Sequence, residues 1–330
     1  MTGSATESAV RVTVIGSAVI DDVQSATGFE QFLGGTGFNL AVALAQEGIP
    51  VALAASIGRD DEGRALRAAL DSLGIAMLAQ PDLTATRHAA TDLSDGEPQY
   101  RFAEDQRRHV SLTSDLVAAL RQSSVVVVNS FPFDSAEDVL ELAAALGSTA
   151  ALRVVDPNPR PDLMGDPQLF VRNLRLLLTN TDIVKISESD LAMLRQDLRQ
   201  FIVGAVQAAF LTKGANGAEI VGADQTVYSI AAVSVMPLAD TIGAGDAALA
   251  GLIAAVLRAE ERTATSGHSE PVSRSLASHD WQAHLGSAMQ AAAACCREHG
   301  GPAHTLFLAG KPDSRRARST GNSQTVAEPS

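Results

Sequence analysis

The sequence predicts an α/β fold with a mostly parallel central sheet, and two observations support that prediction. Short runs of β-branched residues alternate with longer Ala- and Leu-rich amphipathic stretches, which is the pattern of repeated βαβ units. Strand-like runs such as Val125 to Val128 are apolar at every position, as expected where helices cover both faces of a sheet. The 330 residues allow two or three domains, but one large α/β domain with an appendage fits equally well.

The predicted elements follow in chain order. Strands are expected at 10–15, 51–56, 124–129, 152–155, 182–185 and 209–212. Amphipathic stretches predict helices at 38–47, 61–73, 135–146, 245–257 and 281–297. Gly48 and Gly74 come directly after the first two helices, where glycine commonly ends a helix. We therefore expect one core of alternating strands and helices over residues 10–310.

One segment breaks this alternation. The runs 87–93 and 99–103 are typical of two strands, and the turn residues 94–96, Ser-Asp-Gly, lie between them. They predict a hairpin that projects from the sheet and its helices. Residues 260–278 are polar, with Ser, Thr, Gly and Pro, which predicts a flexible surface connection between two helices.

Composition and charge exclude several classes of function. The 25 basic and 38 acidic residues give a net charge of −13, which would repel nucleic-acid backbones and anionic membranes. Cys295 and Cys296 are adjacent and offer neither a disulfide framework nor metal-ligand spacing. The first residues lack a signal-peptide pattern, and no apolar run approaches the roughly 20 residues of a membrane span. We expect a cytoplasmic protein with polar tails at 1–9 and 311–330.

The stretch 240–246, Asp-Thr-Ile-Gly-Ala-Gly-Asp, precedes an apolar helical run and suggests a phosphate site. The small residues Gly243, Ala244 and Gly245 let backbone N–H groups converge, and the helix behind them directs the positive end of its dipole at the same point. Asp246, in the first helical turn, is placed to accept a proton from an alcohol that attacks the bound phosphate. For a lone motif of this kind, an Asp that merely caps its own helix is the alternative.

A second glycine cluster, 34–37, Gly-Gly-Thr-Gly, stands just ahead of Asn39 and a predicted helix. The glycines permit close approach of the backbone to a ligand, and the Asn39 amide can donate and accept hydrogen bonds with a polyol. The cluster is neither a Walker A loop nor a dinucleotide-binding fingerprint. Asp21 and Asp22 follow the first strand, where ligands of parallel sheets bind, and their spacing does not distinguish them.

Together these motifs resemble those of the PfkB carbohydrate kinases of the ribokinase-like superfamily, over residues 10 to about 308. The cluster ending at Asn39 resembles the family's N-terminal signature, and Ile57-Gly58-x-Asp60-x-x-Gly63 follows at the usual distance. The stretch 240–246 resembles the highly specific C-terminal signature. Residues 156–161, Asp-Pro-Asn-Pro-Arg-Pro, are similar to a segment of fructokinases and 2-keto-3-deoxygluconate kinases.

The resemblance implies a three-layer α/β/α sandwich with a small β lid built from about 17–36 and 85–105. It also implies roles for the matching residues. Asp246 would be the catalytic base, and the amides of Gly243, Ala244 and Gly245 would form the anion hole. The sugar would be bound by Asp21, Gly35, Asn39 and Asn158, with Arg160 facing the substrate or the transferred phosphate. ATP would be bound by Lys185, Thr212, Gly214 and Gly217.

Two cations are implied by the same resemblance. Mg²⁺ would accompany ATP, and the Asn-x-x-Glu segment that organises it in the family aligns with 187–190, Ser-Glu-Ser-Asp. Asp190 is one methylene shorter than Glu, so it would contact Mg²⁺ through a water. A monovalent cation such as K⁺ would lie at Asp240 and the carbonyl of Ile242. The lid would also build a homodimer, which is expected by analogy alone.

The sequence therefore predicts an ATP-dependent sugar kinase that phosphorylates a primary hydroxyl of a monosaccharide. A ketose such as fructose is expected from the 156–161 segment. A kinase specific for 2-keto-3-deoxygluconate, ribose or a nucleoside is the alternative within the same chemistry. A sugar-binding regulator that lost turnover is the alternative of another class, and the intact Asp246 argues against it.

Overall fold

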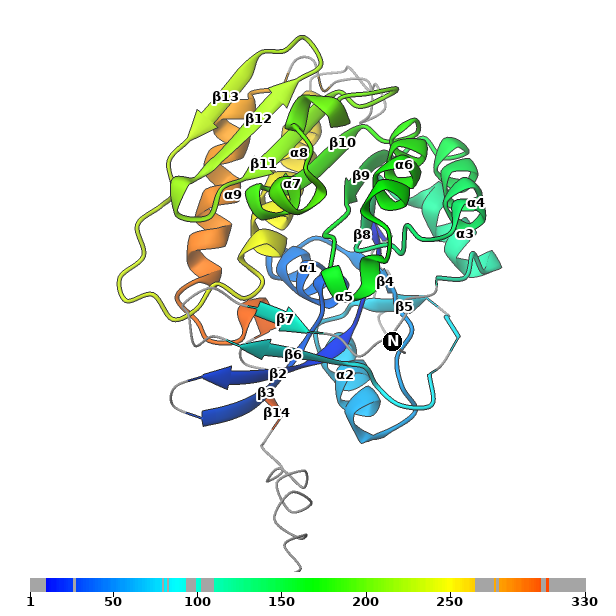
Figure 1. Cartoon of the computed structure of the whole chain (residues 1–330), viewed down its shortest axis with the longest axis vertical. Coiled ribbons are helices and arrows are strands. Elements are labelled where there is room, and N and C mark those ends of the chain that lie inside the picture. Colours follow the sequence, from blue (N-terminus) through cyan, green and yellow to red (C-terminus); the bar gives the residue numbers. More distant parts are fainter. Residues whose placement is uncertain are drawn as a thin grey trace, which may run out of the picture.

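A nine-stranded sheet forms the middle layer of the structure, a computed structural model that describes residues 10–25, 28–78, 80–81, 83–92, 99–101, 110–264, 276, 279–303 and 307–308 (Figure 1). Across the sheet the strands are β13 (Val227–Ile230), β12 (Ala218–Gly222), β11 (Ala208–Thr212), β10 (Ile183–Ser187), β9 (Leu152–Asp156), β8 (Val125–Asn129), β1 (Val12–Ile15), β4 (Val51–Ala54) and β5 (Ala76–Leu78). Only the β11–β12 and β12–β13 pairs are antiparallel in this sheet. The mostly parallel sheet that the sequence predicts is confirmed.

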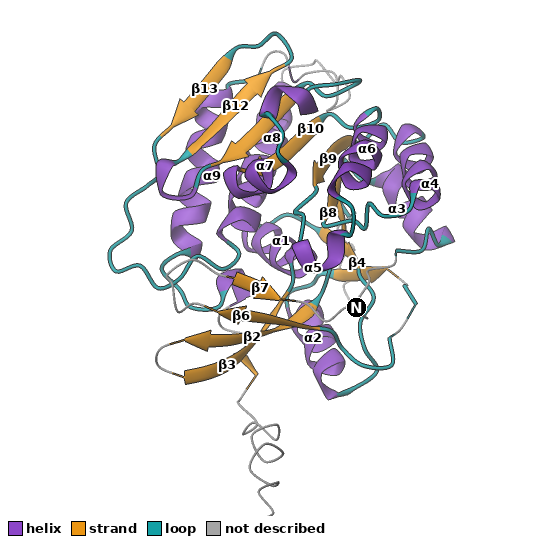
Figure 2. Ribbon diagram, in the orientation of Figure 1, coloured by secondary structure: helices purple, strands orange, loops and turns teal. Residues whose placement is uncertain are grey.

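Helices cover both faces of this sheet (Figure 2) because its strands are apolar on both sides. Along β1, for example, Val12 and Val14 belong to one core cluster and Ile15 belongs to the other. The first face is covered by α1 (Thr36–Gln46), α2 (Asp61–Ser72), α8 (Ala244–Ala264) and α9 (Trp281–Cys295). The second is covered by α3 (Ser114–Gln122), α4 (Ala136–Gly147), α6 (Pro167–Leu178) and α7 (Glu188–Leu194), and the short α5 (Pro161–Met164) contributes Met164.

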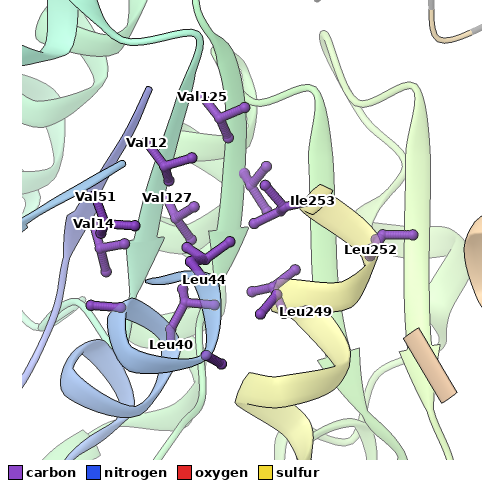
Figure 3. Close-up of a cluster of buried hydrophobic side chains, with 14 of the residues drawn as sticks. Val12, Val14, Leu40, Leu44, Val51, Val125, Val127, Leu249, Leu252 and Ile253 are labelled. Carbon is purple, nitrogen blue, oxygen red and sulfur yellow. The ribbon is translucent and has the colours of Figure 1, made fainter. Parts of the chain in front are cut away.

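The first core cluster joins the middle of the sheet to α1 and α8 (Figure 3). Valine side chains of β1 and β8 meet leucines of both helices there, and the labelled residues are Val12, Val14, Leu40, Leu44, Val51, Val125, Val127, Leu249, Leu252 and Ile253. Leu40, Leu44 and Leu249 are fully buried. This packing holds the first turns of α1 and α8 at the carboxyl ends of the strands.

A second, five-stranded sheet lies at one end of the molecule (Figure 1). Its order is β14 (Phe307–Leu308), β3 (Gly28–Gly34), β2 (Val19–Ser25), β6 (His88–Asp92) and β7 (Gln99–Arg101). The antiparallel pairing of β6 with β7 is the hairpin that the sequence predicts, while residues 93–98, which include its predicted turn, and residues 102–103 lie outside the described residues. We call these five strands the small sheet.

The structure also contains elements that the sequence pattern did not predict, and one predicted boundary was wrong. Strands β5, β12 and β13 were not predicted because each has five residues or fewer. Helices α3, α6 and α7 were not predicted either, although each begins with a residue whose side chain caps the helix. Helix α8 continues to Ala264, so the connection expected at 260–278 begins inside a helix. Its last turns are polar because they face solvent, not because they leave the helix. None of the described helices is long and apolar enough to cross a membrane.

The end of β1 and the start of α1 approach each other at two glycines. A Cβ atom on Gly37 would lie 2.7 Å from the Cα atom of Gly16, closer than real Cβ atoms come. The Phe38 N–H donates to the carbonyl oxygen of Ser17 at 3.0 Å, which fixes the helix at this distance. The glycine pair therefore sets how closely α1 approaches the sheet.

We expect Gly37→Ala to lower the free energy of unfolding by about 1–3 kcal/mol, the usual cost of overpacking. Gly286→Ala on α9 is the matched control, because a Cβ atom there meets nothing within 4 Å and Ala favours a helix by about 1 kcal/mol over Gly. Denaturant unfolding of both variants measures the difference. A Gly37→Ala variant as stable as the wild type would show that the contact can relax.

Candidate active site

A cavity of about 140 Å³ lies where the carboxyl ends of the parallel strands meet strands β2 and β6 of the small sheet. One ordered water needs about 10–15 Å³, so the cavity has room for a small molecule. Its lining is Ser17, Val19, Asp21, Gly35, Thr36, Asn39, Ala89, Asn158, Arg160, Lys185, Thr241, Gly243, Gly245 and Asp246. Both sheets and the first turns of α1 and α8 therefore contribute to one site.

Asp246 lies in the first turn of α8 and is 7% exposed. Its Oδ1 atom accepts a hydrogen bond from Asn129 Nδ2 at 3.2 Å, and the Asn39 side chain is a second partner. Burial raises the pKa of Asp246 to about 7, although the charge of Lys185 and both hydrogen bonds favour the ionised form. A carboxylate with this pKa can exchange a proton near neutral pH, as a general base must.

The backbone turns sharply into α8 just before Asp246. Gly243 has a φ of 71°, a left-handed conformation that glycine adopts without strain. Gly243 and Gly245 line the cavity, whereas Ala244 does not. The Ala244 N–H donates to the carbonyl oxygen of Thr241 at 3.2 Å. The three amides expected to bind an anion are thus not equivalent, because one of them has a partner within its own loop.

Lys185 comes from β10 and lines the same cavity as Asp246. Its Nζ atom lies 2.9 Å from Asp156 Oδ2, and the two side chains are 6% and 0% exposed. Burial alone would lower the pKa of Lys185, but the carboxylates of Asp156, Asp190 and Asp246 outweigh it and raise the pKa. Lys185 therefore brings a permanent positive charge into the cavity.

Asp156 is a functional candidate that we did not assign from the sequence. It ends β9, at the edge of the sheet where ligand-binding residues of parallel sheets lie, and that position was the available signal. Its Oδ1 atom is buried without a hydrogen-bond partner among the described residues. Asn39 Oδ1 is a second buried oxygen of this kind. Because Asn39 lines the cavity, its free acceptor suits a ligand hydroxyl.

The structure distinguishes Asp21 from Asp22. Asp21 lines the cavity and is 5% exposed, and burial raises its pKa to about 7 against the opposing charge of Arg160. Asp22 follows on β2 and points to the opposite face of the small sheet. There its Oδ1 atom accepts a hydrogen bond from Gln31 Nε2 at 2.8 Å. Asp21 is therefore the residue that can reach a ligand.

His88 connects the small sheet to α2. Its Nδ1 atom is 3.0 Å from Asp22 Oδ2, and its Nε2 atom is 3.0 Å from Glu62 Oε2 on α2. Two carboxylate acceptors can both be satisfied only by an imidazolium, which donates from both nitrogens. The hydrogen bond to Asp22 raises the pKa of His88 and outweighs the effect of burial. This contact lies on the side of β2 that faces away from the cavity.

Thr212, Gly214 and Gly217, which we expected at the nucleotide, do not line the cavity. Thr212 ends β11 and is paired with Ser187, which ends β10, and Gly214 and Gly217 come directly after β11. The three residues therefore lie at the edge of the sheet where β10, the strand of Lys185, ends. Gly214 and Gly217 have φ angles of 52° and 90°, and a Cβ atom on Gly217 would lie 2.0 Å from the carbonyl oxygen of Ile230. Glycine is required for this tight turn.

Asp190, Asp240 and Ile242, the expected cation ligands, also lie outside the lining. Asp190 accepts a hydrogen bond from Ser187 N at 2.9 Å, as part of the capping box that begins α7. Asp240 accepts hydrogen bonds from Ile242 N and Gly300 N, each at 2.9 Å, and so joins the loops before α8 and after α9. No group of three or more His, Cys, Asp or Glu side chains among the described residues suits a metal ion.

Three comparisons with known proteins relate the chain to carbohydrate kinases. The model of the pfkB family of carbohydrate kinases matches residues 9–305. A fructokinase from Vibrio alginolyticus is 28% identical over 265 residues, which cover 75% of this chain and 84% of the relative.

Solved structures of kinases share the fold. A sugar kinase from Pyrococcus horikoshii in complex with ATP has a TM-score of 0.71 at 21% identity, covering 89% of this chain and 94% of that one. A double mutant of the fructokinase from Vibrio cholerae O395, in a fructose-, ADP- and potassium-bound form, has a TM-score of 0.66 at 19% identity, covering 90% and 95%. The expected ribokinase-like α/β architecture is thus confirmed.

The His88 contact predicts a pH-dependent contribution to stability. Because the folded protein favours the imidazolium, the contribution is complete below the ordinary His pKa of about 6.5 and is lost as pH rises through the raised folded-state pKa. We expect His88→Gln to lower the free energy of unfolding by about 1–2 kcal/mol near pH 5.5 and by much less near pH 8.5. Denaturant unfolding at both pH values measures this, with Glu62→Gln expected to follow the same trend. Equal losses at the two pH values would contradict the assignment.

Proposed function

The chain belongs to the pfkB family of carbohydrate kinases, and on this basis we propose that it transfers the γ-phosphate of ATP to a primary hydroxyl of a ketose, with fructose the first candidate. The observation that best supports the proposal is the convergence of Asp246 and Lys185 with Asp21 and Asn39 in one cavity. A proton acceptor, a fixed cation and polyol-binding groups are the parts that this reaction needs. The fructokinase relative from Vibrio alginolyticus supports the choice of sugar.

In this proposal Asp246 accepts the proton of the attacking hydroxyl. Its pKa of about 7 leaves it largely ionised just above neutral pH, yet basic enough to take a proton as the O–P bond forms. The hydrogen bond from Asn129 holds Oδ1 of the carboxylate and Asn39 is a second partner, so both amides orient Asp246, which lines the cavity. The oxygen of the sugar then attacks the phosphorus in line with the leaving ADP.

The transferred phosphate would lie at the first turn of α8. The amides of Gly243 and Gly245 border the cavity there, and the Ala244 amide would have to leave its bond to Thr241 to join them. The positive end of the helix dipole and the Lys185 ammonium favour the charge that develops on the phosphoryl oxygens. Arg160 lines the cavity and would contact the sugar or that phosphate.

The acceptor sugar would be held by groups from both sheets. Asp21 and Asn39 would bind its hydroxyls, with Gly35 letting the backbone come close and Asn158 supplying a further amide. Because Asp21 belongs to β2, the sugar would be covered by the small sheet, which would act as a lid. Excluding water in this way prevents hydrolysis of ATP in place of transfer.

ATP would extend from the cavity toward Thr212, Gly214 and Gly217. Asp190, whose charge helps to raise the pKa of Lys185, would hold Mg²⁺ through a water, and the ion would supply positive charge that neutralises the phosphates of ATP. Mg²⁺ keeps most of its ligands as water and phosphate oxygens, so one carboxylate in the neighbourhood fits it. The carboxylate of Asp240 and the carbonyl of Ile242 are oxygen donors that suit K⁺.

Two further expectations complete the proposal. The small sheet would also form a homodimer interface, which the family resemblance suggests. Cys295 and Cys296 are both free thiols, which is consistent with a cytoplasmic enzyme in a reducing compartment.

A panel of acceptors tests the substrate. We expect ADP release with fructose to exceed release with ribose, adenosine and 2-keto-3-deoxygluconate by at least about tenfold in kcat/KM, which corresponds to about 1.4 kcal/mol of discrimination. A coupled ADP assay with each acceptor measures the ratios. Preference for 2-keto-3-deoxygluconate would instead assign Arg160 to a substrate carboxylate, and no turnover with any acceptor would favour the regulator alternative.

Replacing the proposed base tests the mechanism. We expect Asp246→Asn to lower kcat by about 10²–10⁴-fold, the usual contribution of a general base, while the KM for the sugar changes little. In the wild type, kcat should fall as pH drops below about 7, because a protonated Asp246 cannot accept a proton. Steady-state kinetics across pH measure both effects.

The matched control for this variant is Asp224→Asn, the same chemical change on a fully exposed turn between β12 and β13, which should leave kcat as in the wild type. An Asp246→Asn enzyme with wild-type kcat would overturn the proposed base.

A further inference from the structure

We infer that Asn129 and Ser130 are positioning residues that orient the Asp246 carboxylate and connect it to the side chains of the sugar cavity. This inference rests on the proposed role of Asp246 and assigns a task to two residues outside the family motifs. Asn129 ends β8 and Ser130 follows it, and they are 0% and 2% exposed. The Ser130 N–H donates to the carbonyl oxygen of Asp156 at 2.8 Å, which anchors the pair to β9.

The Asn129 amide has a determined orientation. Its Nδ2 atom donates to Asp246 Oδ1 at 3.2 Å, and its Oδ1 atom accepts from Ser130 Oγ at 3.1 Å. A flipped amide would place its carbonyl oxygen against the carboxylate and its NH₂ against the Ser130 hydroxyl. Because Asp246 can only accept when ionised, the amide must present a donor to it. Asn129 therefore favours the ionised form of Asp246 and fixes one of its oxygens.

Ser130 supports that orientation because its hydroxyl group makes three hydrogen bonds. It donates to Asn129, and it accepts from Thr36 Oγ1 at 2.9 Å and from Asn158 Nδ2 at 2.9 Å. One donor and two acceptor positions are all that a hydroxyl has. Thr36 donates its only hydroxyl proton to Ser130. Thr36 can therefore only accept from Ser17, whose Oγ atom lies 3.2 Å from Thr36 Oγ1.

The donors thus run in one direction, from Ser17 through Thr36, Ser130 and Asn129 to Asp246. Such chains polarise each member, which strengthens the last bond. Ser17, Thr36 and Asn158 all line the cavity, so a bound sugar contacts the start of the same chain whose end is the proposed base. The orientation of Asp246 is therefore linked to the groups that surround the acceptor.

The backbone gives an independent observation. Ser130 and Asn158 have φ angles of 58° and 39°, a left-handed region that residues with a Cβ atom seldom occupy. Both belong to this network and hydrogen-bond each other. Non-glycine residues in this conformation are held by their surroundings and cluster at functional sites. In this conformation the Ser130 hydroxyl donates to the Asn129 amide oxygen.

The test separates positioning from simple packing. We expect Asn129→Leu, which keeps the size of the side chain but removes its donor, to lower kcat by about 10–100-fold with a smaller change in sugar KM. Losing a donor to the ionised form also raises the pKa of Asp246, so the acidic limb of the kcat profile should move to higher pH. Lys185 on β10, Asp156 on β9, Asn39 on α1 and Cys295 on α9, the other polar groups that face Asp246, are unchanged in this variant.

Asn173→Leu is the matched control. Asn173 on α6 is equally buried and donates one hydrogen bond, to the carbonyl oxygen of Phe133, but lies outside the cavity. This variant should lose stability without moving the pH profile. If Asn129→Leu behaves in the same way, with kcat and the acidic limb unchanged, the inference is wrong.

Ser130→Gly keeps the inference testable should Asn129→Leu fail to fold. Glycine adopts the left-handed conformation without strain, which offsets part of the stability lost with the three hydroxyl hydrogen bonds, so this variant should fold while its kcat falls about tenfold. Full activity in Ser130→Gly would overturn the inference. The two proposals can fail separately. If Asp246→Asn keeps the wild-type kcat, the proposed base is wrong. If Asp246→Asn is inactive but Asn129→Leu and Ser130→Gly keep the wild-type kcat and pH profile, only the positioning role is wrong.

Discussion

The buried ion pair of Lys185 and Asp156 is the interaction on which the geometry of the site depends. Moving each charge out of water costs several kcal/mol, so this pair is stable only with close contact and further partners. The contact is 2.9 Å, and the charges of Asp190 and Asp246 supply the partners of the ammonium. A Cβ atom on Gly245 would lie 3.4 Å from Lys185 Nζ, so the same ammonium also faces the first turn of α8. The fixed positive charge and the positive end of a helix therefore meet at one point.

This local arrangement resolves an apparent conflict with the overall charge. The chain has a net charge of −13, yet the proposed donor substrate is itself a polyanion. Charges on the surface are screened beyond about 8–10 Å at physiological salt, whereas charges inside the cavity are screened far less. In the proposed site, the buried Lys185, Arg160 in the cavity lining and the amides of α8 would therefore decide whether a phosphate binds. Excess acidic residues elsewhere would repel larger polyanions such as nucleic acids without closing the proposed site to ATP.

Local signals account for the parts of the fold and site that could be predicted. A short motif determines the backbone at the start of a helix, and Gly243, Asp246 and Asn39 lie at such starts. The sequence motifs therefore predicted that these residues would lie in one site. The hairpin β12–β13 was missed because its two short strands have no long apolar run. Asp21 and Asp22 could not be separated, because alternation along a strand identifies two faces without saying which one meets the cavity. Asn129 lies 117 residues from Asp246, so their hydrogen bond exists only in the folded chain.

The attachment of the small sheet to the rest of the structure explains why Asp21, and not Asp22, faces the cavity. Asp60, the N-cap of α2, accepts hydrogen bonds from Thr86 N at 2.6 Å and Thr86 Oγ1 at 2.5 Å, directly before β6 begins. Two residues later His88 joins Glu62 of α2 to Asp22 of β2. These contacts attach β6 and β2 to α2, which covers one face of the nine-stranded sheet, and they lie on the side of β2 that faces away from the cavity. A one-residue slip of β2 would exchange its two faces, placing Asp22 in the cavity and leaving His88 without its partner. The contacts of His88 outside the site therefore support the register that places Asp21 within it.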